Sequence, residues 1–169
     1  MEADKQVKEG SGYIFAYYFD EEFINKDCFL TKDQKKSFEG GFGAVIYANY
    51  TNSSAGPYQE LLFIPGKFAV DGNESYVITK AYCSSAKAME QQVFCKKELA
   101  DFTVEKSDDG TETIIVTRDG KPIFRIAVQP WGFNIPMTSD VVKFPRYQPS
   151  SPSLTPSSTG FGEGKSFSA

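Results

Sequence analysis

Short β-prone segments, separated by strong turn signals, run through this 169-residue chain and constrain its fold more than any other feature. Aromatic and β-branched residues dominate these segments, and Gly, Pro, Asn or Asp lies near their ends. The expected strands are residues 12–19, 43–50, 58–64, 75–83, 102–106, 111–117 and 122–129. The last three are separated by SDDG and RDGK, which are too short for crossovers and predict tight hairpins. The pattern therefore predicts an antiparallel sheet and not a doubly wound parallel fold.

Helical signals are few. Residues 84–92, SSAKAMEQQ, combine a serine N-cap with strong helix formers and predict one short helix. Residues 20–40 fit a second short helix or an irregular loop. In residues 75–83, polar and apolar side chains occur on both faces, which suits a strand lining a partly dry barrel. The expected fold is mostly β (α+β), an antiparallel sheet or barrel, and 15 Phe and 9 Tyr are enough aromatic residues to wall an apolar cavity.

The length of the chain predicts a single domain, and its composition predicts that the two terminal segments differ from that domain. Residues 1–11 are charged and are expected to form a flexible N-terminal lead, followed by the β domain at residues 12–144. Residues 145–169 are dominated by Ser, Pro, Gly and Thr and predict a loop or tail, since they cannot bury enough apolar surface to offset their ordering entropy.

Charge and hydropathy argue against two classes of partner. The net charge is −4 and the basic residues are scattered, so no nucleic-acid partner is expected. No apolar run approaches the roughly 18 residues of a membrane span. The N-terminus also lacks the apolar core of a signal peptide, and we expect a soluble, cytoplasmic protein with no membrane partner.

The chain contains no histidine, which excludes Ser-His and Cys-His nucleophile pairs and His-containing metal sites. Cys28, Cys83 and Cys95 have no C-x-x-C spacing and are expected to be free thiols in a reducing compartment. Asp108-Asp109 is expected to be a turn and not a metal site. Any acid–base or covalent chemistry therefore depends on carboxylates, lysine, tyrosine or cysteine.

Three segments together resemble the acetoacetate decarboxylase family. GPYQELLFIPGKF (56–68) resembles the family's G-P-Y-x-E strand with its Pro-Gly exit. SYVITKAYCSSAKAMEQQVFCKKELADF (75–102) resembles the strand, helical turn and P-K-[KE]-L-[AG] segment that carries its Schiff-base lysine, and FRIAVQPWGFNIPM (124–137) resembles the strand that follows. The resemblance implies a cone-like barrel around an apolar cavity, a homo-oligomer and cofactor-free chemistry. In that chemistry a lysine amine attacks a keto acid, and the iminium accepts electrons as carbon dioxide leaves.

The chemistry explains why such a lysine needs a special environment. A lysine amine with an ordinary pKa near 10.4 is protonated, and hence unreactive, at neutral pH. Burial in an apolar pocket lowers that pKa, and an adjacent cation lowers it further. Acetoacetate decarboxylase is itself an established example of a lysine activated in this way.

The stretch VFCKKELADF, residues 93–102, offers two registers for the reactive lysine. Anchoring on Leu99-Ala100 puts Lys97 at the Schiff-base position and Glu98 in place of the family's second lysine. Anchoring on the lysine pair makes Lys96 the nucleophile and Glu98 an insertion. Because the first register needs no insertion, we predict that Lys97 enters the cavity and that its neighbours face away.

The resemblance also assigns a role to Glu60, which matches the carboxylate of the Y-x-E strand and would orient the substrate or handle a proton. The family's other active-site carboxylate would fall near Val45, and no arginine before Arg118 matches its N-terminal substrate-binding arginine. In place of a cation, Glu98 would raise a neighbouring lysine's pKa. These departures favour aldol condensation, dehydration or cyclisation of a keto acid over decarboxylation.

Two hypotheses follow. The first is a cofactor-free, lyase-like enzyme that acts on a small keto acid through Lys97, or Lys96, with Glu60. The alternative is a noncatalytic β-barrel that binds a small apolar or carbonyl-bearing ligand. Because family domains are longer, the chain is expected to be either a shortened relative or a fragment whose barrel an oligomer or partner would close.

Overall fold

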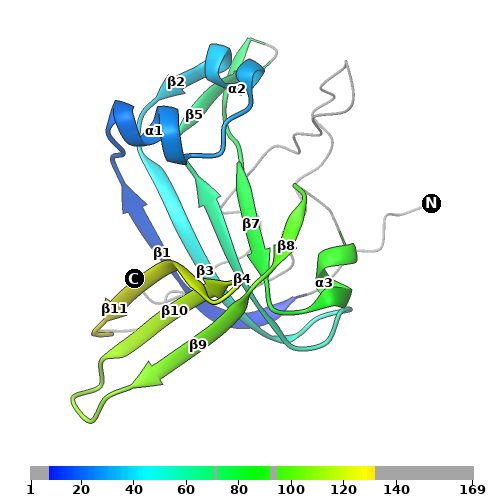
Figure 1. Cartoon of the computed structure of the whole chain (residues 1–169), viewed down its shortest axis with the longest axis vertical. Coiled ribbons are helices and arrows are strands. Elements are labelled where there is room, and N and C mark those ends of the chain that lie inside the picture. The colour runs from blue at the N-terminus through cyan, green and yellow to red at the C-terminus, as the bar shows by residue number, and fades with distance from the viewer. Residues whose placement is uncertain (1–7, 71, 92–94, 132–169) are drawn as a thin grey trace.

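The computed structural model describes residues 8–70, 72–91 and 95–131, and its largest element is a five-stranded sheet (Figure 1). The strand order is β1-β3-β4-β7-β8, with bounds Glu9–Tyr17, Gly43–Asn52, Tyr58–Ile64, Lys80–Cys83 and Lys97–Leu99. The first four strands pair antiparallel. β8 pairs parallel to β7, since the chain crosses from one to the other through the short helix α3 (Ala86–Glu90).

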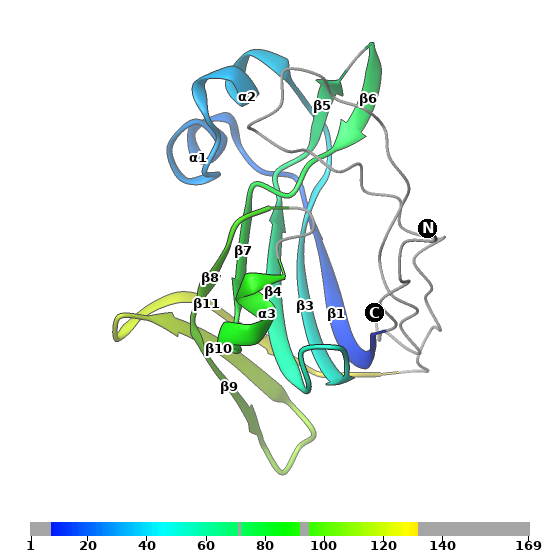
Figure 2. The same cartoon turned by 90° about the vertical axis from the view of Figure 1, so that its right-hand side faces the viewer.

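Two small sheets lie at opposite ends of the central sheet (Figures 1 and 2). One is an antiparallel meander of β9 (Asp101–Lys106), β10 (Glu112–Arg118) and β11 (Lys121–Val128). The other contains β2 (Phe38–Gly40), β5 (Lys67–Val70) and β6 (Asn73–Tyr76), with helices α1 (Glu21–Asp27) and α2 (Lys32–Ser37) beside it. The architecture is mostly β, as the sequence predicts.

Both faces of the central sheet are buried, which explains the nearly continuous apolar runs in β3 and β4. One face packs against the β9–β11 meander through a single core cluster, whose buried members are Tyr13, Val45, Tyr47, Leu61, Tyr82, Ile114 and Val116. The opposite face carries two further clusters. The first is Ile46, Leu62, Ile64, Ile78 and Ala81, and the second is Ala48, Tyr50, Tyr58, Cys83 and Ala88. Since Ala88 belongs to α3, this helix covers one end of that second face.

The turn predictions are confirmed. Arg118 pairs with Lys121, and the two residues between them, Asp119 and Gly120, have φ angles of 51° and 73°. Positive φ at both central positions is the geometry of a type I′ turn, which matches the twist of the flanking strands. The β9–β10 turn contains Gly110 at φ 85°, whose amide donates to the carbonyl of Ser107 at 3.0 Å.

The expected barrel is not closed among the described residues. β1 and β8 are the two edges of the central sheet, and the chain leaves the short β8 at once for β9, which belongs to another sheet. The apolar cavity expected inside a barrel stays a prediction. Residues 145–169, expected to form a tail, lie outside the described residues.

The structure differs from the sequence-based expectations in the helices, in one strand and in the N-terminal lead. The described residues contain three helices, since residues 20–40 form two, α1 and α2, where at most one short helix is expected; Asp20 and Thr31 cap these two helices as Ser85 caps α3. The strand expected at residues 75–83 is broken into β6 and β7. The break separates two sheets, since β6 pairs with β5 and β7 pairs with β4 of the central sheet.

The first strand begins at Glu9, so residues 9–11 of the expected lead are paired with β3. Two glycines make this close approach feasible. A Cβ at Gly10 or Gly12 would lie 2.2 or 2.1 Å from the carbonyl oxygens of Asn49 and Tyr47. Within the described residues, no helix has the length and apolar character needed to span a membrane.

Candidate active site

The face of the central sheet away from the β9–β11 meander holds the two residues that the sequence singles out. Along β4, Tyr58, Glu60 and Leu62 share that face because side chains alternate along a strand. Lys97 lies opposite Ala81 of β7 and reaches diagonally across β7 to β4. Its Nζ lies 2.7 Å from Oε1 of Glu60, and the two residues are only 5% and 2% exposed.

Small neighbours make room for this buried ion pair. Glu60 is in register with Ala48 of β3 on one side and with Cys83 of β7 on the other, and both are buried. Oε1 of Glu60 meets Lys97 as an ion pair without hydrogen-bond geometry, and no hydrogen-bond donor reaches this oxygen within the described part of the chain. A buried carboxylate oxygen of this kind is a free acceptor for a proton or for a bound hydroxyl.

A second amine, Lys8, reaches the same carboxylate from the start of β1. Its Nζ donates to the hydroxyl of Tyr58 at 2.6 Å and lies 4.0 Å from Oε2 of Glu60. It also lies 4.8 and 5.4 Å from the ring centres of Tyr50 and Tyr58, within cation–π range. The side chain of Lys8 is 12% exposed. The site is therefore a triad of two lysines and one glutamate, walled by two tyrosines.

Burial sets the protonation of the groups around the triad. Desolvation lowers the pKa of Lys8, and the charge of Lys97 lowers it further, while the charge of Glu60 acts in the opposite sense. The pKa values of Tyr50, Tyr58 and Cys83 are all raised, in each case chiefly by burial. At neutral pH the tyrosines and the thiol are therefore uncharged.

The other two residues of the Lys-Lys-Glu stretch lie elsewhere. Lys96 is exposed. Glu98 faces the opposite side of the sheet, where it forms ion pairs with Lys80, at 2.5 Å, and with Arg118. Alternation along β8 therefore separates Glu98 from the Lys97 amine, and the cation near Lys97 comes from Lys8, far away in sequence.

The cysteines are free thiols, as predicted. Burial raises the pKa of Cys95 to about 11, which leaves its thiol protonated and unreactive at neutral pH. In the described part of the chain, no group of three or more carboxylate or thiol residues is arranged to hold a metal ion.

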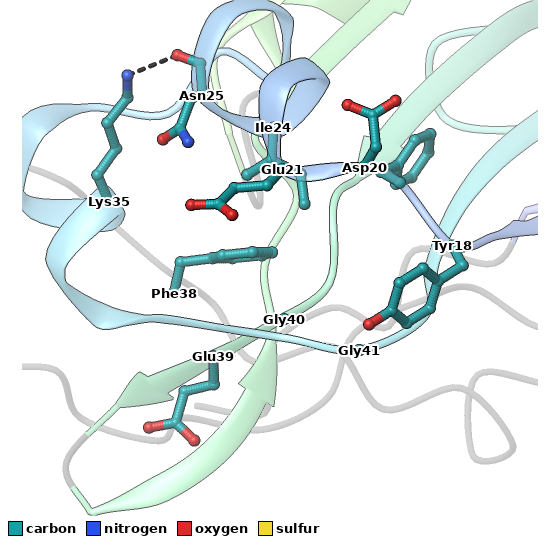
Figure 3. Close-up of a pocket in the computed structure, with 11 residues that line it drawn as sticks. Tyr18, Asp20, Glu21, Ile24, Asn25, Lys35, Phe38, Glu39, Gly40 and Gly41 are labelled. Carbon is teal, nitrogen blue, oxygen red and sulfur yellow. Dashed lines mark hydrogen bonds between the residues drawn. The ribbon is translucent and has the colours of Figure 1, made fainter.

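A hollow of about 490 Å³ lies at the far end of the fold, between α1, Lys35 in the last turn of α2, and β2 (Figure 3). Its lining is mixed, with Asp20, Glu21 and Glu39 beside Tyr18 and Phe38, and it includes none of the triad. It is not the apolar cavity that the sequence predicts around Lys97.

Comparison with known proteins identifies the fold. No protein-family model and no curated protein matches the chain. Among solved structures, acetoacetate decarboxylase from Legionella pneumophila matches with a TM-score of 0.58 at 14% identity, over 80% of this chain and 53% of that one. The chain has an acetoacetate decarboxylase-like fold. The predicted resemblance is thereby confirmed at the level of the fold.

Two further structures share the acetoacetate decarboxylase-like fold. Another acetoacetate decarboxylase matches with a TM-score of 0.56 at 11% identity, over 77% of this chain and 52% of that one. The enduracididine biosynthesis enzyme MppR, complexed with the condensation product of pyruvate and imidazole 4-carboxaldehyde, matches with a TM-score of 0.54 at 13% identity, over 72% of this chain and 54% of that one. The chain thus spans about half the length of the solved structures it matches.

Because burial lowers the pKa of Lys8, this residue destabilises the fold at neutral pH. We expect Lys8→Met to raise the free energy of unfolding by about 1 kcal/mol at pH 7, since an apolar side chain of similar length removes a poorly compensated buried charge. Between the lowered pKa and the ordinary value of 10.5, the unfolded wild-type chain binds more protons than the folded one. The wild type therefore gains stability as pH rises through that interval, and the advantage of the variant shrinks. Urea unfolding of both proteins at pH 7 and pH 10 measures the stability difference between them and its change with pH. A Lys8→Met variant that is less stable than the wild type at pH 7 would contradict this expectation.

Proposed function

We propose that the protein is a cofactor-free, lyase-like enzyme that forms a Schiff base between Lys97 and a small keto acid. The observation that carries this proposal is the buried contact of 2.7 Å between the Lys97 amine and the Glu60 carboxylate. Burying a lysine and a glutamate almost completely costs free energy of solvation, and ionisable groups held in this way are concentrated at functional sites.

The proposed reaction assigns a role to each member of this pair. Lys97 first gives up a proton to become a free amine, and its nitrogen then attacks the carbonyl carbon. The electrons of the carbon–oxygen double bond move to oxygen, which takes up a proton to give a carbinolamine. Glu60, adjacent to the amine, receives the first proton and later returns one to the leaving hydroxyl as water departs. The product of this stage is an iminium.

The iminium can accept an electron pair from a neighbouring carbon–carbon or carbon–hydrogen bond. Loss of carbon dioxide gives an enamine, which takes up a proton and is hydrolysed to regenerate Lys97. Loss of a proton in place of carbon dioxide gives the same kind of enamine, which can attack an aldehyde in an aldol condensation. The solved neighbours support this range of chemistry, since one is an acetoacetate decarboxylase and another holds a condensation product of pyruvate.

Borohydride trapping tests the proposal. The 169-residue protein is incubated with acetoacetate or pyruvate, reduced and mapped by mass spectrometry. A reduced imine on Lys97 is the expected result, and Lys97→Met is expected to abolish the label. Lys87→Met, which removes an exposed lysine of α3, serves as the matched control and keeps the label.

Three other results would contradict this assignment of Lys97. A label on Lys96 would favour the second sequence register. Saturable binding of either acid without any trapped adduct would favour the noncatalytic carrier. Equal labelling of Lys97 and Lys87 would indicate nonspecific reaction with exposed amines.

A further inference from the structure

The triad has one more amine than it has carboxylates. Lys8 and Lys97 share Glu60, and no other acidic side chain forms an ion pair with either amine in the described part of the chain. With all three groups ionised, the buried site would hold one uncompensated positive charge. A buried charge without a counter-charge raises the free energy of the folded protein, because its surroundings have a low dielectric constant. Loss of a proton from one of the two amines removes this cost.

The contacts of the two lysines differ. Lys97 lies 2.7 Å from its carboxylate oxygen, which stabilises its charge, whereas Lys8 lies 4.0 Å from the other oxygen. The direct polar contact of Lys8 is the hydroxyl of Tyr58 at 2.6 Å, a neutral partner that either an amine or an ammonium can use. Lys8 is therefore the amine that is more easily held neutral.

We propose that Lys8 is the positioning residue that takes the proton of the Lys97 ammonium, through the Glu60 carboxylate lying between them, and so prepares Lys97 for attack. This inference depends on the proposed function. One proton passes from Lys97 to Oε1 of Glu60, and one passes from the carboxyl group to Lys8. Lys97 becomes a free amine, Lys8 becomes an ammonium, and the total charge of the site does not change.

The surroundings of Lys8 support this direction of transfer. The titratable groups that face it come from four strands, and they are Tyr50, Tyr58, Glu60, Cys83 and Lys97. The tyrosines and the thiol stay neutral because burial raises their pKa values, so the charges that face Lys8 from the described residues are those of Glu60 and Lys97. Burial lowers the pKa of Lys8 and the charge of Lys97 lowers it further, against the opposing charge of Glu60, so Lys8 is neutral over a wider range of pH than an exposed lysine.

The pH profile of imine formation tests the role of Lys8. The rate of borohydride-trapped adduct formation with acetoacetate or pyruvate is measured from pH 5 to pH 10 for the wild type, Lys8→Arg and Lys8→Met. Arginine keeps the positive charge but cannot accept a proton, and methionine has neither property. In the wild type, we expect the rate to rise with pH and level off once Lys8 is neutral. In both variants we expect the rate at pH 7 to be at least tenfold lower than in the wild type. We also expect the rising part of the pH–rate curve to lie at higher pH than in the wild type. A purely structural role would lower the rate without moving this rising part.

A second measurement separates the inference from the proposed function. Lysine side chains labelled with ¹³C at Cε are titrated by NMR, and the Lys8 signal is assigned by its absence from Lys8→Arg. A Lys8 signal that titrates well below those of the exposed lysines supports the inference, and one that titrates with them overturns it. A rate and pH profile unchanged in Lys8→Met would also overturn it. A wild-type protein that forms no adduct with either acid overturns the proposed function, while the NMR titration still reports the protonation of Lys8.

Discussion

Replacing Glu60 by glutamine is expected to lower the free energy of unfolding by about 3–5 kcal/mol, the usual cost of removing one partner from a buried ion pair. Glutamine has nearly the same shape, so the loss comes from charge and not from packing. Without the carboxylate, the Lys8 and Lys97 amines face each other in a buried site with no counter-charge. Urea unfolding at pH 7 measures the effect. The dependence of the unfolding free energy on urea concentration should be the same in the variant and the wild type, so that the two free energies can be compared.

Two control variants sharpen this prediction. Glu105→Gln, at an exposed position of β9, is expected to change the free energy of unfolding by no more than about 0.5 kcal/mol. Removing Lys97 as well, in Glu60→Gln/Lys97→Met, is expected to recover part of the loss, because only one buried amine then lacks a partner. A Glu60→Gln variant as stable as Glu105→Gln would mean that the carboxylate does not compensate the amines.

The strands of the fold could be predicted because their signals are local. Alternation and turn chemistry give the bounds of β4 and place β3, β9, β10 and β11 within a few residues. Lys97 and Glu60 could be proposed because each lies in a short, contiguous motif, although Lys96 occupies the proline position of the motif around Lys97. The pairing of their side chains required one more fact, the position of β7 between β4 and β8.

Lys8 could not be predicted because its role depends on contacts between distant segments. It precedes Glu60 by more than 50 positions and lies in a charged segment that reads as a mobile lead. The pairing of Glu9 with Asn52, and a hydrogen bond of 3.2 Å from the Thr51 hydroxyl to the Glu9 carbonyl, hold the start of β1. Lys8 is brought to Glu60 by this pairing and not by any sequence motif.

The parallel pairing of β8 was missed for a similar reason. Three residues are too few to show an alternation, and the direction of β8 is set by the crossover through α3. The register of β8 on β7 decides the site, because Lys97 lies opposite Ala81, on the face of Glu60, and Glu98 lies opposite Tyr82, on the other face.

Replacing Ile114 by alanine is expected to lower the free energy of unfolding by about 2–5 kcal/mol, the range observed when a large aliphatic side chain is truncated in a core. Ile114 is fully buried in β10, the middle strand of the meander, and belongs to the cluster that joins the meander to the central sheet. The removed methyl groups leave a cavity that two packed sheets cannot easily close.

The neighbouring strand provides a matched control for Ile114→Ala. Ile123 of β11 is 40% exposed, and its truncation to alanine is expected to cost less than about 1 kcal/mol. Since the Ile114 cluster lies on the face of the sheet opposite to Lys97, trapping at Lys97 should persist in Ile114→Ala once the label is corrected for the folded fraction. Equal destabilisation by the two truncations would contradict the packing of the meander onto the sheet. Loss of the label from folded Ile114→Ala would show that the face bearing Lys97 depends on the opposite face for more than stability.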